Sequence, residues 1–166
     1  MIFLFIVTLG LIVVGSAIFY GIGPNISSSK ALRLVLESIP KGSKKVYDLG
    51  SGFGLSAYYL AKKRPDCEVI GIEASLIPYL FSLLFCLKQK NLKIYWKNFY
   101  DVSLEKTDVV YCYLYRKAMK KLLKKFEEEL HQNSLVISYT FALKKKEDLV
   151  FDLGGFYQNK LYVYRF

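Results

Sequence analysis

The stretch from Lys44 to Gly54 reads KKVYDLGSGFG, an apolar strand end followed by Gly50, Gly52 and Gly54, with Asp48 just before them. A triphosphate-binding loop would end in Gly-Lys-Ser/Thr, and that ending is absent here. A dinucleotide-binding loop has its third glycine one position later and needs no acid ahead of the first. An acid so close to the loop would repel a phosphate, so it favours a ligand that carries a positive charge.

A second acid, Glu73, follows the next predicted strand and can accept hydrogen bonds from both hydroxyls of a ribose. The two acids together indicate a nucleoside with a cationic tail and no phosphate. S-adenosylmethionine fits, because it combines adenine and ribose with an α-amino group and a sulfonium. The competing interpretation is that the glycines only permit a tight turn and that Glu73 is a surface acid.

Strand and helix patterns alternate around this loop. We expect a short first helix, capped by Ser27, Ser28 or Ser29 and ending near Ile39. Strands are predicted at 45–49, 68–72, 92–96, 108–114 and 135–141, with intervening helices at 54–63, 75–90 and 117–131. Two more strands, 149–153 and 161–166, have no helix between them. The pattern predicts an α/β fold with a doubly wound, mostly parallel sheet and an antiparallel C-terminal hairpin.

The run from Ile2 to Ile22 contains no charged residue. At ~1.5 Å per residue it would form a helix of about 31 Å, long enough to cross a bilayer. A signal peptide would carry Lys or Arg before its apolar stretch, and a core helix would be polar on one side. We therefore expect a transmembrane anchor at 1–23 and a compact domain at 24–166. The basic residues that follow place this domain on the cytoplasmic, or equivalent reducing, side.

The cysteine, histidine and charge content of the sequence argue against several kinds of site and partner. Cys67, Cys86 and Cys112 are scattered and odd in number, which fits a reducing compartment and no metal site. A single histidine, His131, argues against a histidine-based triad or a zinc centre. The net charge of +10 comes largely from an amphipathic helix whose basic face is in solvent or lies against anionic lipid. No segment resembles a nucleic-acid module, so we expect no nucleic acid as partner.

The segment Asp48–Gly54, followed by Glu73, resembles the first two motifs of class I S-adenosylmethionine-dependent methyltransferases. From Gly23 onward the chain is similar to the small membrane-anchored protein-lysine methyltransferases that modify the ATP synthase c subunit or the adenine nucleotide translocase, and to their prokaryotic relatives. Its segments GPNISS (23–28) and NFY (98–100) stand where those proteins carry a hydroxyl-containing stretch and an Asp-Leu pair. The resemblance implies a Rossmann-like fold, S-adenosyl-L-methionine as cofactor and a protein lysine as methyl acceptor.

Together, the motif and the resemblance predict the following cofactor-binding residues: Asp48, Gly50, Ser51, Gly52, Gly54, Glu73, Asn98 and Phe99. Asn98, where the family has Asp, would contact adenine or else only cap a turn.

Tyr113 and Tyr115 would shape an aromatic channel for the substrate lysine, unless they are packing residues. The expected partners are the lipid bilayer and a membrane-associated protein substrate. Two alternatives stay open: a small-molecule or lipid acceptor, and a scaffold that keeps the fold without the cofactor. Phe53 and Leu55 leave room for the second, because the family usually has an acid and a basic residue there.

Overall fold

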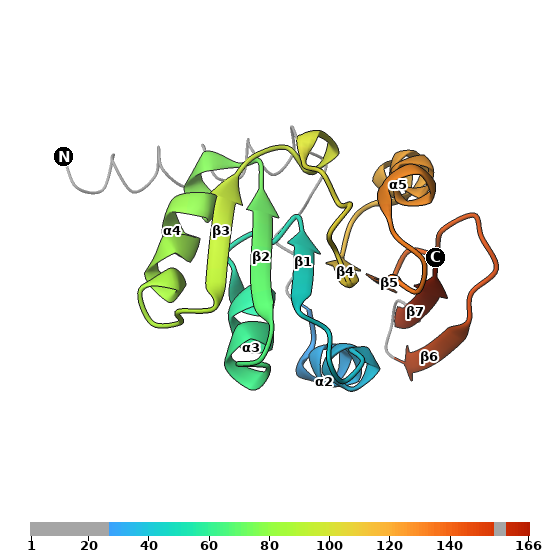
Figure 1. Cartoon of the computed structure of the whole chain (residues 1–166), viewed down its shortest axis with the longest axis horizontal. Coiled ribbons are helices and arrows are strands. Elements are labelled where there is room, and N and C mark those ends of the chain that lie inside the picture. Colours follow the sequence, from blue (N-terminus) through green and yellow to red (C-terminus); the bar gives the residue numbers. More distant parts are fainter. Residues whose placement is uncertain (1–26, 155–158) are drawn as a thin grey trace.

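The computed structural model describes residues 27–154 and 159–166, which form a seven-stranded sheet (Figure 1). The strands are β1 (Lys45–Leu49), β2 (Glu68–Glu73), β3 (Leu92–Trp96), β4 (Val109–Cys112), β5 (Leu135–Tyr139), β6 (Leu149–Gly154) and β7 (Asn159–Arg165). Their order is β3-β2-β1-β4-β5-β7-β6, in which β1 to β5 are parallel and β7 runs antiparallel between β5 and β6. The predicted Rossmann-like α/β sheet with its C-terminal hairpin is confirmed.

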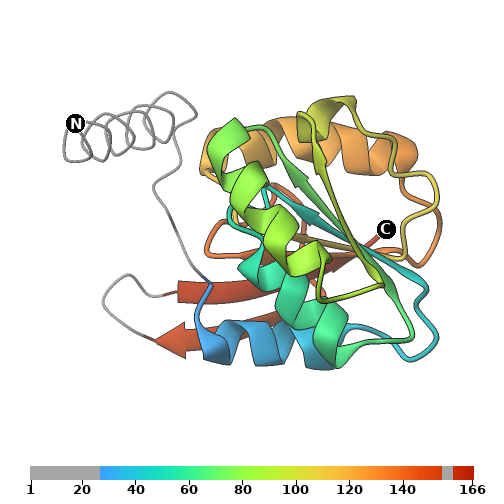
Figure 2. The ribbon, with the colours of Figure 1, turned by 90° about the vertical axis from the view of Figure 1, so that its left-hand side faces the viewer.

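Helices cover the sheet on both faces (Figure 2). Three of them, α2 (Ser29–Ser38), α3 (Leu55–Lys63) and α4 (Leu76–Cys86), pack on one face. The amphipathic helix α5 (Arg116–Glu129) packs on the other through Met119, Leu122 and Phe126, so its basic residues face outward. The chain from β3 to β4 contains only the short 3-10 helix η1 (Phe99–Asp101), which the sequence did not predict.

Several predicted boundaries need correction. The helix expected to reach position 90 ends at Cys86, and the strands expected to reach 114 and 141 end at Cys112 and Tyr139. The helix expected at 117–131 spans Arg116–Glu129. The expected serine cap is confirmed as Ser28, whose Oγ accepts a hydrogen bond from the Ala31 N–H at 3.1 Å.

The predicted anchor at 1–23 lies outside the described residues. Within 27–154 and 159–166, no helix has the length and apolar character needed to cross a membrane.

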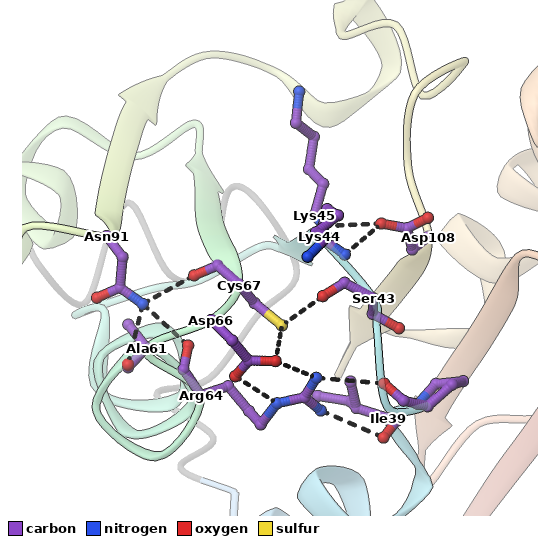
Figure 3. A network of polar contacts seen from close by, with 11 residues as sticks. Ile39, Ser43, Lys44, Lys45, Ala61, Arg64, Asp66, Cys67, Asn91 and Asp108 are labelled. Carbon is purple, nitrogen blue, oxygen red and sulfur yellow. Dashed lines mark hydrogen bonds and ion pairs between the residues drawn. The ribbon is translucent and has the colours of Figure 1, made fainter.

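Side-chain hydrogen bonds fix the amino edge of the sheet (Figure 3). The Asn91 amide nitrogen, just before β3, donates to three carbonyl oxygens, those of Ala61, Arg64 and Cys67, at 3.0, 3.0 and 2.8 Å. The Arg64 guanidinium donates to both carboxylate oxygens of Asp66 at 2.9 Å and to two carbonyls at the end of α2. These bonds join α2, α3, β2 and β3 at one edge, and leave the opposite edge for ligands.

Candidate active site

The candidate site lies at the carboxyl edge of the sheet, where the strand order reverses between β1 and β4. The chain leaves β1 toward α3 on one face and leaves β4 toward α5 on the other. Such a divergence opens a crevice in which doubly wound folds bind ligands. The loop after β1, Glu73 at the end of β2 and Asn98 after β3 all lie at this edge.

The three loop glycines have positive φ angles, but for different reasons. A Cβ at Gly50 would lie 2.7 Å from Leu114 Cδ2, and a Cβ at Gly54 would lie 2.7 Å from Ser82 Cβ. A Cβ at Gly52, where φ is +55°, would meet no atom within 4 Å. Gly50 and Gly54 therefore permit close packing, while Gly52 borders open space that a ligand can fill.

The N–H groups of this loop are bonded within the protein. Those of Gly50 and Ser51 donate to the Ile72 carbonyl at 2.8 and 3.0 Å. The Gly52 N–H donates to Glu73 Oε2 at 2.8 Å, and the Gly54 N–H donates to the Ser51 carbonyl at 2.9 Å. A phosphate-binding loop aims such groups at its ligand. The geometry therefore agrees with the sequence argument against a phosphate.

Asp48 is almost completely buried, with 2% of its surface exposed. Burial raises the pKa of its carboxyl from 3.8 to about 7, a hydrogen bond from Ser56 opposes that shift, and the charge of Glu73 adds to it. A ligand cation beside Asp48 would favour the ionised carboxylate. The environment of Asp48 thus suits an ammonium group.

Glu73, 6% exposed, links two backbone segments. Its Oε2 accepts the Gly52 N–H, and its Oε1 accepts the Ser75 N–H at 2.7 Å. Each carboxylate oxygen can accept a further hydrogen bond. Glu73 therefore positions the glycine loop and still has acceptor capacity for ligand hydroxyls.

The three other predicted cofactor residues, Asn98, Phe99 and Ser51, differ in their contacts within the protein. Asn98 Oδ1 accepts the Tyr100 N–H at 3.1 Å, so its turn-capping role is confirmed. The Phe99 ring is buried in the core against Tyr100, which leaves only its backbone for a ligand. Ser51 Oγ is buried with no partner among the described residues, and a Cβ at Gly71 would lie 2.9 Å from it. The contacts of these residues with the cofactor stay predictions.

The structure separates Tyr113 from Tyr115. Tyr113 packs against Tyr139, with ring centroids 4.5 Å apart, on the α2 and α3 face. Tyr115 precedes α5 and packs into the core on the opposite face. A single channel lined by both rings does not follow from this arrangement, so Tyr113 is the better candidate for an acceptor contact.

The sequence of this chain matches the family model of the ANTKMT methyltransferase domain over residues 48–148. The chain belongs to this family. It is accordingly an S-adenosylmethionine-dependent methyltransferase, as the motif resemblance predicted. A search of curated proteins found no match.

Solved structures agree with this family assignment at the level of the fold. An RNA methyltransferase from Salinibacter ruber in complex with S-adenosyl-L-homocysteine is 20% identical, with a TM-score of 0.77 over 85% of this chain and 93% of that one. A ribosomal protein L11 methylase from Lactobacillus delbrueckii subsp. bulgaricus is 15% identical, with a TM-score of 0.70 over 86% and 81%. Identities this low establish the fold and leave the acceptor open.

Sequence reasoning missed several residues that shape this methyltransferase site. Ser56 bonds Asp48, and the buried Tyr111 hydroxyl bonds Ser27 Oγ at 2.5 Å, which ties the start of the described chain to β4. Tyr139, the ring beside Tyr113, carries no signal in the sequence beyond its place in a strand. A hydroxyl shortly after the last loop glycine is too common a pattern to single out Ser56. The pairing of Tyr111 with Ser27 depends on tertiary contacts between residues far apart in sequence.

Within 27–154 and 159–166, no group of three His, Cys, Asp or Glu side chains could hold a metal ion. The single histidine of the sequence, His131, is exposed and follows α5.

Proposed function

We propose that this methyltransferase transfers a methyl group from S-adenosylmethionine to the ε-amino group of a lysine in a membrane-associated protein. The observation that carries the proposal is the match to the ANTKMT methyltransferase domain over residues 48–148. The uncharged run Ile2–Ile22 would anchor the enzyme in the same membrane. The basic residues after that run support a catalytic domain on the cytoplasmic, or equivalent reducing, side.

The residues at the carboxyl edge fit the cofactor. Asp48 offers a carboxylate to the α-amino group, and Glu73 offers acceptor lone pairs to the ribose hydroxyls. Gly52 leaves space for a ligand beside the backbone, and Asn98 with the Phe99 backbone, at the same edge, would contact adenine. When bound, S-adenosylmethionine supplies a methyl group already activated on a sulfonium.

The protein's task is then to align a neutral amine. A lysine has an unperturbed pKa of ~10.4, so its amine must lose a proton before it can attack. Burial of the acceptor nitrogen against Tyr113 and Tyr139, near a positive charge, lowers that pKa without a dedicated base. A pKa lowered in this way removes the need for a histidine base, and His131 lies at the other end of α5 from the site.

Isotope transfer tests the proposal. Purified full-length protein is incubated with native membranes and S-adenosylmethionine labelled in the methyl group, and the product is hydrolysed to amino acids. Label in methyllysine from a membrane protein is the expected result. Label only in lipid, in RNA or in a soluble small molecule would overturn the acceptor assignment.

A further inference from the structure

Helix α4 presents an apolar surface that no described residue covers. The exposed side chains of α4 and of Leu87, the residue after it, are Leu76, Leu80, Phe81, Leu84 and Leu87, at 45, 52, 51, 57 and 85% exposure. The spacing of 76, 80, 84 and 87 puts them on one side of the helix, which we call the α4 face. The helix sequence LIPYLFSLLFC contains no charge. Soluble monomers rarely leave a contiguous apolar patch of this kind in water.

The α4 face extends to the cofactor loop. Phe53, inside that loop, packs edge-on against Phe81 with ring centroids 5.9 Å apart. At the other side Trp96, 55% exposed, stacks on Tyr79 and donates its Nε1–H to the Ala74 carbonyl at 2.8 Å. Both rims of the face are thus aromatic, and one of them belongs to the candidate active site.

The surroundings of the α4 face are basic. The exposed Lys88, Lys90 and Lys97 follow α4 and β3, and positions 74–97 contain no Asp or Glu. Within the described residues none of these lysines takes part in an ion pair. Exposed leucines and phenylalanine with a tryptophan at the rim and lysines around them are typical of helices that lie in a membrane interface.

The described chain begins at Ser27, close to the carboxyl edge of the sheet. Ser27 is bonded to Tyr111 on β4, and only residues 23–26 separate it from the apolar run that ends at Ile22. The five residue steps from Ile22 to Ser27 extend at most about 18 Å, since each step adds ~3.3–3.6 Å. A bilayer that holds Ile2–Ile22 therefore lies close to the carboxyl edge of the sheet, where α4 begins at the outer, β3 end (Figure 1).

We infer that the α4 face, with Phe53 and Trp96 at its rims, inserts into the interfacial layer of an anionic bilayer. The inference rests on the proposed function, because it takes the Ile2–Ile22 run as the anchor. It adds a second membrane contact, which fixes the orientation of the domain. The cofactor loop then lies at the lipid surface, and the acceptor lysine must reach it at headgroup level.

Trp96, the single tryptophan of the chain, reports on this contact directly. The full-length protein is placed in vesicles of phosphatidylcholine and phosphatidylglycerol whose acyl chains are either plain or brominated near the headgroup. Insertion to the depth of an interfacial helix should lower the Trp96 emission roughly twofold in the brominated vesicles and protect it from aqueous iodide. Equal emission in both vesicles, with full access to iodide, would overturn the inference.

Paired variants separate the α4 contact from the anchor. In the double variant Leu80→Glu/Leu84→Glu, lipid quenching of Trp96 should disappear while the protein still sediments with vesicles. The matched control, Leu149→Glu/Val150→Glu, alters exposed apolar residues on the far edge strand β6 and should keep the quenching. Both variants should bind S-adenosylmethionine like the wild type, which shows that they are folded.

Three other outcomes would each refute insertion of the α4 face. Sedimentation without quenching in the wild-type protein refutes the α4 contact and leaves the anchor and the enzyme activity standing. Failure of the wild-type protein to bind vesicles refutes both the anchor and the α4 contact. Trp96 shielded from lipid and iodide alike would mean that the chain's own N-terminal segment or a second copy covers the face, and would refute insertion.

Discussion

Asp48 and Glu73 are two buried carboxylates on neighbouring parallel strands. Asp48 is in register with Gly71 of β2, and Glu73 lies two residues further along that strand. Desolvation first, and then the charge of Glu73, raises the pKa of Asp48 to about 7. A cation beside both carboxylates would offset the desolvation of Asp48 and its repulsion by Glu73. A positively charged ligand should therefore stabilise the site.

Cofactor affinity should therefore depend on pH. Asp48 must be ionised to attract the ammonium group, so binding should tighten as pH rises through about 7. Asp48→Asn should remove most of this dependence and weaken binding about tenfold to a hundredfold, as expected for one lost charge-assisted hydrogen bond. Calorimetric titrations at about pH 6 and about pH 8 measure both effects, and an unchanged pH profile in the variant would contradict the role of Asp48.

The same carboxyl affects folding stability with the opposite sign. Its folded-state pKa exceeds its ordinary value, so between about pH 4 and about pH 7 the folded chain holds a proton that the unfolded chain has released. The free energy of unfolding of the cofactor-free protein should fall as pH rises across this window, by at most about 4 kcal/mol from this group. Denaturation curves of the wild-type protein and Asp48→Asn would show the difference, and parallel curves would refute it.

Substitutions at the loop glycines should separate binding from packing. Gly52→Val fills the open space beside the loop, so it should abolish cofactor binding while costing only about 1–2 kcal/mol of stability for its positive φ. Gly54→Ala is the matched control, because its Cβ would press on Ser82 and Ile94 and should destabilise the fold more. Calorimetry and thermal unfolding measure the two quantities. Near-native affinity of Gly52→Val would show that the ligand lies elsewhere.

Most helices and strands, but not every side-chain position, were predictable from the sequence. The order and type of the main elements followed from periodicity, and the glycine loop followed from its chemistry. The separation of Tyr113 from Tyr115 was not predictable in this way. β4 pairs with β1 and β5 only as far as Cys112, so beyond that residue strand alternation no longer fixes which face a side chain takes. The sequence offered a capping role for Asn98 as one alternative, but the 3-10 helix η1 that it caps has no periodic signal.

The hydrogen bonds of Asn91 form a junction between α3, β2 and β3 at the amino edge of the sheet, and their loss should lower the stability of the fold. Asn91→Ala removes the donor shared by the carbonyls of Ala61, Arg64 and Cys67. The amide nitrogen carries two hydrogens, so with ~0.5–1.5 kcal/mol per hydrogen bond the free energy of unfolding should fall by about 1–3 kcal/mol. Cofactor affinity of the folded protein should stay unchanged, because the junction lies opposite the site. Denaturant unfolding measures the first quantity and calorimetry the second; an intact stability would refute the structural role.

For the molecule as a whole, the proposed anchor would determine where the active site can meet its substrate. A short connection between Ile22 and Ser27 would confine the active site to the membrane surface, where a substrate lysine is met at high effective concentration. The basic outer face of α5 lies on the opposite side of the sheet from the α4 face, so the orientation inferred for α4 leaves it in solvent. Methylation at the membrane should then depend on the anchor, while cofactor binding should not.

The most direct measurement is the initial rate of lysine methylation on native membranes by three proteins of equal cofactor affinity. These are the full chain, a version without residues 1–22, and a version in which an unrelated transmembrane helix replaces those residues. The account predicts a much slower rate for the shortened protein and a rate close to that of the full chain for the replacement. Equal rates for the shortened and full-length proteins would contradict it, and would point to a soluble acceptor.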